Sequence, residues 1–204
     1  MRHIPLAGIL LFIGIAFGWR PWLQYRRYGT SGVVLFRSRQ LGQIARDSLT
    51  VVWFVLLLGQ AAAVAALPHW LPSRALIHGP VSEILQAAGA VLLVGGLVLT
   101  VKAQLELGAS WRIGIDEAAK PGLVTSGIYA FSRNPIFLAF LIILTGYTLL
   151  VPTVLSVAML IGTYVGIRLQ IAAEEDYLER SYGAAYLDYA RRTGRLLPGL
   201  GRER

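Results

Sequence analysis

Cysteine is absent from the 204-residue sequence, and charged residues are scarce. Without cysteine the chain can form no disulfide, no zinc–thiolate site and no thiol nucleophile. Charged residues make up 15% of the chain, whereas hydrophobic residues make up 55% and the mean hydropathy is +0.59. This apolar content exceeds what the core of a 22.3 kDa soluble domain needs. The composition therefore indicates an integral membrane protein and excludes a disordered chain.

Four apolar stretches account for this composition. Leu49–Leu67 and Ile84–Val101 have the length that crosses a hydrocarbon core of about 30 Å as a helix. Ile4–Phe17 is shorter, and we interpret it as a further membrane helix. Pro135–Ile167 is too long for one crossing, and Gly146–Pro152 interrupts it with helix-weakening residues, which predicts a helical hairpin. The sequence therefore predicts an all-α protein with about five transmembrane helices.

Basic residues alternate between the predicted loops. Seventeen of the nineteen lie in three segments, 20–46, 102–133 and 168–204, whereas Arg2 and Arg74 lie on the other side. Because lysine and arginine concentrate in cytoplasmic loops, this distribution predicts an outside N-terminus and a cytoplasmic C-terminus. It also explains the net charge of +8 without a nucleic-acid partner.

Ionisable residues are nearly absent within the predicted spans. Glu83 and Arg168 lie only near span ends. Proton-coupled transporters and ion channels usually need charges within the membrane, so the sequence argues against both classes. His3, His69 and His78 are separated and adjoin no acidic cluster, so we expect no metal site. Any chemistry should therefore take place at the cytoplasmic edge.

Two pairs of glycines have the spacing of close helix contacts. Gly14 with Gly18, and Gly162 with Gly166, form small-xxx-small patterns. We interpret them as packing sites within one chain, with a dimer contact as the alternative. The expected state is a monomer or a weak homodimer.

The first polar segment of the cytoplasmic edge contains a glycine-bounded loop and a helix start. Gly122 and Gly127 flank a turn or short extended loop whose backbone groups could face a ligand, and an ordinary loop is the alternative. In Arg133-Asn134-Pro135, asparagine is a favoured N-cap and proline a favoured first helical residue. A helix N-terminus favours an anionic group, whereas the simpler interpretation is a capped helix beside a cytoplasmic arginine.

The second polar segment predicts an amphipathic helix on the membrane surface. Glu174 and Glu175 begin it, either as functional carboxylates or as a solvated acidic pair. Arg168 and Arg180 are candidates for binding an anionic ligand or, alternatively, are positive-inside charges, with Asp176 as a surface partner of Arg180. The apolar and aromatic stripe of this helix consists of Leu178, Tyr182, Tyr186 and Tyr189.

Together, and in this order, these motifs resemble the isoprenylcysteine carboxyl methyltransferase family and the related phospholipid methyltransferases, which are integral membrane enzymes. The resemblance covers Leu107 to Pro198, close to half of the chain. It rests on Leu-Val-x-x-Gly-x-Tyr from Leu123, Arg-Asn-Pro at a helix start, a helical hairpin, Glu-Glu-x-x-Leu, Tyr-Gly, two spaced tyrosines and a basic end with Leu-Pro. Asn134 departs from the pattern, because many members have histidine there.

The resemblance implies S-adenosylmethionine as the cofactor, bound by the cytoplasmic C-terminal region. Consistent with this, no Gly-x-Gly-x-x-Gly motif of a dinucleotide-type fold follows a strand-like segment. By analogy, the cofactor-binding residues are Leu123, Val124, Tyr129, Arg133, Asn134 and Glu175, and the catalytic candidates are Glu174, Arg168 and Arg180. Either glutamate could contact the cofactor ammonium, and Arg133 suits its carboxylate.

The sequence therefore predicts a single membrane domain, with helices over residues 1–101 and a cofactor-binding and catalytic region over 102–204. The expected function is methyl transfer from S-adenosylmethionine to a lipophilic acceptor: a lipidated carboxylate, a phospholipid amine, or a small hydrophobic thiol or acid. A non-enzymatic membrane scaffold or small-solute carrier is the alternative. We expect a bacterial inner membrane protein whose active site faces the cytoplasm.

Overall fold

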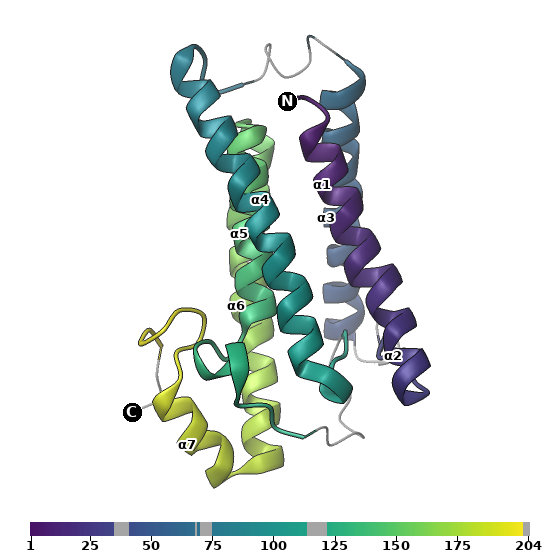
Figure 1. The fold of residues 1–204 in the computed structure, drawn as a ribbon, viewed down its shortest axis with the longest axis vertical. Helices are drawn as coiled ribbons and strands as arrows, with labels where there is room; N and C mark the ends of the chain where they lie inside the picture. Colours follow the sequence, from purple (N-terminus) through teal and green to yellow (C-terminus); the bar gives the residue numbers. More distant parts are fainter. Residues whose placement is uncertain (35–40, 68, 70–74, 114–121, 202–204) are drawn as a thin grey trace.

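The computed structural model describes residues 1–34, 41–67, 69, 75–113 and 122–201 (Figure 1). This part of the chain is helical, with two isolated β-bridges. Its elements are α1 (Ile4–Ile13), the π-helical η1 (Gly14–Trp19), α2 (Arg20–Tyr28), α3 (Leu41–Ala66), α4 (Pro80–Leu107), the 3-10 helices η2 (Gly108–Ser110) and η3 (Gly127–Ala130), α5 (Pro135–Leu150), α6 (Val154–Tyr182) and α7 (Ala184–Arg192).

Long apolar helices dominate the structure and confirm the predicted all-α membrane fold. Four segments of the described chain are long and apolar enough to cross a membrane: Ile4–Tyr28, Asp47–Ala66, Pro80–Ser110 and Val154–Tyr182. The fifth apolar helix, α5, has 16 residues, which corresponds to about 24 Å and is shorter than a full crossing. It packs most extensively against α4 and also against α6.

The first span is longer than the predicted Ile4–Phe17. The helix continues through η1 into α2 and ends at Tyr28. Pro21 lacks a backbone N–H, and its ring would crowd the preceding turn of a regular α-helix. The π-helical stretch precedes this proline, and the Arg20 N–H donates to the carbonyl of Ile15, five residues earlier. The widened turn therefore carries the helix past the proline.

The two ends of the bundle differ in what they carry. In Figure 1 the N-terminus lies at one end, together with the turn between α5 and α6, and α7 lies at the opposite end, with α2, η3 and the C-terminus. We call these the N-terminal end and the α7 end. The termini therefore lie at opposite ends, as an odd number of crossings requires. Six basic residues used in the topology prediction lie outside the described residues: Arg37, Arg39, Arg74, Lys120, Arg202 and Arg204.

Glycines bring α4 and α5 into close contact. A Cβ on Gly89 would lie 2.7 Å from the carbonyl oxygen of Gly146, and a Cβ on Gly96 would lie 2.5 Å from Cγ1 of Ile143. Side chains at these positions would force the helices apart, so the crossing depends on glycine. Gly146 therefore packs a helix, whereas we had predicted it to interrupt one.

The hairpin turn lies just beyond this crossing. Thr153 caps α6 through reciprocal hydrogen bonds with Ser156, which form a capping box. α5 ends at Leu150, so the turn occupies only the last part of the predicted Gly146–Pro152 interruption. Gln60 donates to the Thr153 hydroxyl at 2.7 Å and thereby ties α3 to this turn.

Three of the four glycines of the small-xxx-small patterns do not make the predicted packing contact within the described chain. Among the described residues, no atom outside the helix's own backbone lies within 4 Å of a Cβ built on Gly14, Gly18 or Gly166. Gly162 does make a close contact there, with the Trp53 ring at 2.7 Å. The Trp53 indole N–H donates to the Thr163 hydroxyl at 2.8 Å, and this bond joins α3 to α6.

We expect the substitution Gly146→Ala to lower the free energy of unfolding by about 1 to 3 kcal/mol, because it overpacks the α4–α5 crossing. The added methyl would lie 2.6 Å from the Gly89 carbonyl oxygen and 2.7 Å from the Leu93 nitrogen, both backbone atoms. Thermal unfolding in detergent measures this change. Gly95→Ala on α4 is the matched control, since no neighbouring atom of the described residues lies within 4 Å of its Cβ. Equal melting temperatures for the two variants would contradict the assigned crossing.

Candidate active site

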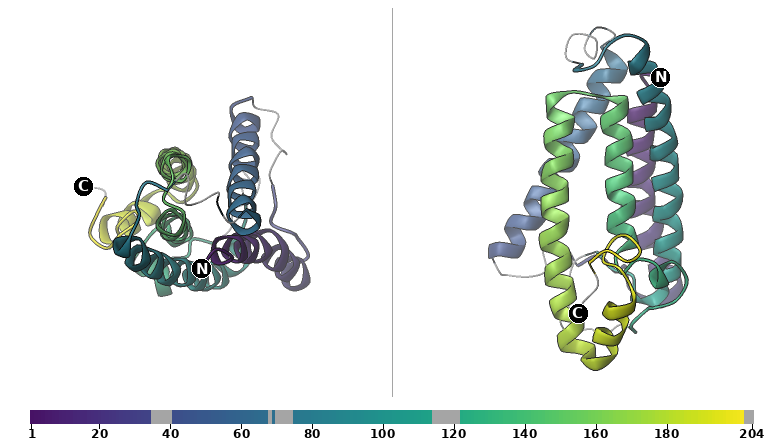
Figure 2. Two further views of the ribbon diagram at one scale, coloured as in Figure 1. Left: turned by 90° about the horizontal axis from the view of Figure 1, so that it is seen from above. Right: turned by 90° about the vertical axis from the view of Figure 1, so that its left-hand side faces the viewer.

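A cavity of about 580 Å³ extends from the middle of the bundle toward the α7 end. Its walls toward the N-terminal end are apolar and aromatic, and they come from α1, α3, α5 and α6. Its polar part is formed by the end of α4, the segments 110–113 and 122–124, the start of α5 and the last turns of α6. The view along the bundle shows α3 standing apart from α5 and α6 (Figure 2). Volume and lining are those of a small-molecule site.

Six of the nine predicted site residues line this cavity. They are Leu123, Val124, Tyr129, Arg133, Asn134 and Glu174. The tertiary structure therefore brings the glycine-bounded loop, the start of α5 and the acidic segment of α6 to one place. The other three, Glu175, Arg168 and Arg180, do not line it.

Tyr129 connects the loop to its supports. Its hydroxyl donates to the carbonyl of Ala103 on α4 at 3.2 Å, and its own carbonyl accepts from the Tyr189 hydroxyl on α7 at 2.7 Å. Burial raises the pKa of both tyrosines, so both phenols stay protonated and remain donors. The loop conformation also depends on Gly127, which has φ +60°, a value that side chains disfavour. The Ile128 N–H next to it donates to the carboxylate of Glu106.

Arg133 is a structural clamp, and this differs from its predicted role. The residue is 7% exposed, and all five of its donor hydrogens can be assigned to protein acceptors. Nη1 donates to the carbonyls of Ala190 and Thr193 at 2.7 and 2.9 Å, and Nη2 to that of Gly201 at 3.1 Å. Nε and Nη2 contact Glu175 Oε1 at 3.0 and 2.9 Å. A cofactor carboxylate would have to displace these partners, so the expected contact does not fit this geometry.

Glu175 completes the clamp. Its second oxygen, Oε2, forms an ion pair with Nη2 of Arg195 at 2.6 Å, so one buried carboxylate joins two arginines. These contacts leave Glu175 outside the cavity lining and unsuited to its predicted contact with the cofactor. Asn134 belongs to the same assembly, because its amide donates to the carbonyl of Arg195 at 3.1 Å. It occupies the N-cap position of α5, but its side chain makes no capping hydrogen bond.

Glu174 has a different environment from its neighbour. It is half-buried and lines the cavity. Within the part of the chain that the structure describes, its carboxylate has one hydrogen-bond partner, the amide of Gln170 at 2.9 Å. No arginine of that part pairs with it, in contrast to Glu175. Glu174 is therefore the carboxylate of the pair that can act on a ligand.

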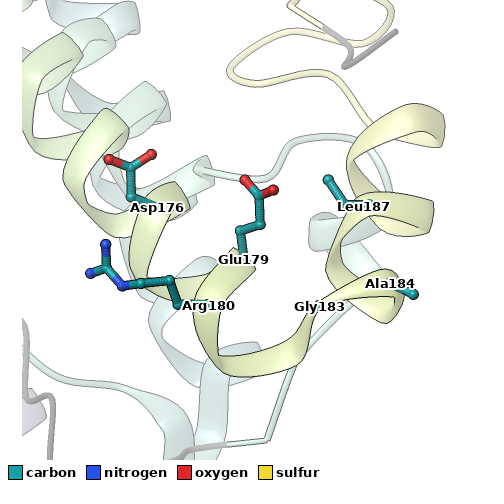
Figure 3. A pocket seen from close by; sticks show the side chains of 6 residues that line it. All are labelled: Asp176, Glu179, Arg180, Gly183, Ala184 and Leu187. Atoms are coloured by element: carbon teal, nitrogen blue, oxygen red, sulfur yellow. The ribbon is translucent and has the colours of Figure 1, made fainter.

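Arg168 and Arg180 lie outside the cavity lining, so the cavity gives no support to their predicted contact with an anionic acceptor. Both side chains belong to exposed residues of α6. Figure 3 shows Arg180 beside Asp176, at an open depression between the last turn of α6 and α7. The helical register explains the difference, because Gln170, Glu174 and Leu178 share the cavity face at spacings of four residues.

Sequence analysis missed two buried polar residues of the cavity. Asp47 and Gln104 are both buried and both line it. Gln104 lies near the end of a largely apolar α4, and an amide at that position could have indicated a functional residue. Asp47 lies at the start of the apolar part of α3, where it resembles an ordinary helix-end charge.

The fold and the cavity together define the class of this protein: it is a membrane-embedded helical bundle with a small-molecule cavity toward one end. The sequence model of the family described as phospholipid methyltransferase matches residues 84–185, which is half of the chain. The chain therefore belongs to this family of integral membrane proteins. The matched range extends from α4 to the start of α7 and includes all nine predicted site residues: the seven that lie in the cavity or its clamp, and the exposed Arg168 and Arg180.

A curated relative agrees with this assignment, and a solved structure has a similar fold. Protein-S-isoprenylcysteine O-methyltransferase A from Arabidopsis thaliana is 30% identical over 105 residues, which are 50% of this chain and 53% of the relative. The chain thus spans about half the length of that curated relative. A solved structure of a eukaryotic intramembrane Ras methyltransferase, isoprenylcysteine carboxyl methyltransferase, matches with a TM-score of 0.57 at 22% identity and covers 91% of this chain and 62% of that one. This likeness supports the fold.

The two adjacent glutamates should respond differently to the same substitution. We expect Glu175→Gln to lower the free energy of unfolding by about 3 kcal/mol, because it leaves buried arginine charge without its counterion. Glu174→Gln, which breaks no ion pair in the described chain, should leave the melting temperature nearly unchanged. Thermal unfolding in detergent and limited proteolysis of the C-terminal segment measure both effects. Equal stabilities would show that the clamp does not hold this end together.

Proposed function

We propose that the protein transfers a methyl group from S-adenosylmethionine to a lipophilic acceptor. The observation that carries this proposal is that residues of the family motifs, between Leu123 and Asn134 and at Glu174, line one cavity. The walls of this cavity toward the N-terminal end are apolar. A cavity that is polar at one end and apolar at the other suits two ligands of different character. Bringing them together in fixed orientation and away from water can supply much of the rate of a methyl transfer.

The residues at the polar end fit the proposed cofactor. Leu123 and Val124 offer apolar contacts for an adenosine, and Tyr129 offers a buried aromatic ring. Glu174 offers a carboxylate for an ammonium group, which is a charge-assisted interaction. When bound, S-adenosylmethionine would supply an electrophilic methyl group. Arg133, Asn134 and Glu175 would act as positioning residues, since they hold the start of α5 and the C-terminal segment around the site.

The apolar walls favour an acceptor that arrives from the bilayer. Phe12, Phe54 and Phe140 are among the lining residues. A lipidated carboxylate, a phospholipid amine, and a small hydrophobic thiol or acid all fit this description. A thiolate or carboxylate needs no catalytic base, whereas an amine must lose a proton, for which Glu174 is placed as a candidate base. Glu174 therefore serves either the cofactor or the acceptor.

The competing function is a membrane scaffold or small-solute carrier. Such a protein would have no need to bind an adenosyl cofactor. Isothermal titration of the detergent-purified protein with S-adenosylhomocysteine, the product form of the cofactor, separates the two functions. A flat titration on folded protein would overturn the enzyme proposal.

We expect S-adenosylhomocysteine to bind in the micromolar range, which is roughly −8 kcal/mol. Glu174→Gln keeps the size of the side chain and removes its charge, so it should weaken this binding about tenfold or slow turnover to a similar extent. Glu179→Gln, the same change at an exposed site on α6, is the matched control and should retain wild-type behaviour. If the two variants bind and turn over alike, Glu174 has no role in the site.

We further propose that the α7 end faces the cytoplasm, in a bacterial inner membrane. The positive-inside distribution supports this orientation, because 17 of the 19 basic residues belong to segments that the predicted topology places on that side. Reporter fusions at residues 1 and 204 should give signals for opposite faces, with residue 1 outside. Signals from the same face would mean that one of the spans, most simply the short α5, does not cross.

A further inference from the structure

Arg20 is the most deeply buried charged residue of the described chain. It is 1% exposed and lies at the start of α2, beside the last turn of α4. Its Nη2 donates to the carbonyl of Gly108 at 2.7 Å and its Nε to that of Gln104 at 3.2 Å. The guanidinium also lies over the Trp111 ring, 4.7 Å from the ring centre. The hydrogen-bond and ring partners of this positive charge are therefore all neutral groups.

The hydrogen bonds of this cluster are incomplete. Within the described chain, no carboxylate forms an ion pair with Arg20, and its buried Nη1 has no hydrogen-bond partner. Two buried amide oxygens are also without partners, Oε1 of Gln24 and Oε1 of Gln104. A buried charge without a counterion is costly, and a residue of this kind near the membrane is a candidate ligand site. The contrast with Arg133, whose donors all have protein acceptors, is clear.

The cluster adjoins the polar end of the cavity. Gln104 and Trp111 both line it, and each contacts Arg20 directly, one through its carbonyl and the other through its ring. Arg20 also acts electrostatically on the phenol of Tyr129, another lining residue. Within the described chain, the unsatisfied charge therefore lies outside the cavity lining and directly against two residues of its wall, Gln104 and Trp111.

We propose that Arg20, with Gln24 and Gln104, forms an anion subsite that takes the carboxylate or phosphate group of a molecule in the cavity. Arg20 itself is not a lining residue, so the subsite requires a lining side chain, Gln104 or Trp111, to move aside until an anionic oxygen reaches Nη1 of Arg20. The glutamine amides can donate or accept to suit the neighbouring groups. This inference rests on the proposed function only for the identity of the ligand. The anionic group belongs either to the cofactor, whose amino-acid end carries a carboxylate, or to an acidic acceptor.

Gln104→Glu tests the subsite, because it supplies Arg20 with an internal counterion that competes with a ligand anion. The substitution should preserve folding, because the new carboxylate pairs with the buried charge of Arg20. Gln24→Glu supplies the same counterion from α2, one helical turn after Arg20. Gln86→Glu makes the same change near the other end of α4 and is the matched control. A thermal unfolding scan in detergent accompanies each variant.

Two pairs of probes, titrated at pH 8, separate the sources of the anion. S-adenosylhomocysteine is compared with 5′-methylthioadenosine, which lacks the amino-acid end, and laurate is compared with dodecanol. We expect each glutamate variant to weaken one anionic probe at least tenfold, while its neutral counterpart and the Gln86→Glu control change less than twofold. Loss of S-adenosylhomocysteine binding assigns the subsite to the cofactor, and loss of laurate binding assigns it to an acceptor.

The inference is overturned if both anionic probes bind folded Gln104→Glu and Gln24→Glu as tightly as wild type. In that case Arg20 only joins α2 to α4, with waters on its remaining donor. It is also overturned if the wild-type protein prefers neither anionic probe over its neutral counterpart. A wild-type protein that binds laurate through Arg20 but does not bind S-adenosylhomocysteine would refute the proposed cofactor and leave the anion subsite standing.

Discussion

The α7 end of this protein depends on one buried carboxylate between two arginines. Glu175 joins Arg133, at the start of α5, to Arg195, in the C-terminal segment. Arg133 in turn satisfies the terminal carbonyls of α7. Because each buried charge would be costly alone, the three groups hold one another in place. These contacts close the α7 end of the bundle, and a hydrogen bond from Tyr189 of α7 holds the Tyr129 loop there.

The rest of the bundle is packed unevenly, and the uneven packing leaves space for a ligand. Glycines bring α4 and α5 into backbone contact on one side. On the other side, α3 is tied to α6 by Trp53 and to the α5–α6 turn by Gln60, toward the N-terminal end. Between these ties and the clamp lies the cavity. Its walls are apolar where the bundle crosses the membrane and polar where the family motifs meet.

Adjacent motif residues have different tasks in this arrangement. Glu174 and Glu175 are neighbours in sequence, but the helix turns one toward the cavity and the other toward the two arginines. The same division separates Arg133, which holds the structure together, from Arg20, which carries unsatisfied charge beside the cavity. The proposed methyl transfer would require orientation more than acid–base chemistry, so a site in which many residues position and few react is physically reasonable.

Composition, hydropathy and short local motifs determined the membrane class, the helical hairpin and the helix start at Pro135, because these depend on local patterns and on the length of a bilayer crossing. The order of the motifs also indicated the family. The sequence could not tell Glu174 from Glu175, or Arg133 from Arg20, because each charge takes its role from partners up to 88 residues away. Nor could it locate the close helix crossing, since Gly14 and Gly146 look alike until the partner helix is known. Only the tertiary structure decides which polar groups are satisfied by the chain itself and which remain for a ligand.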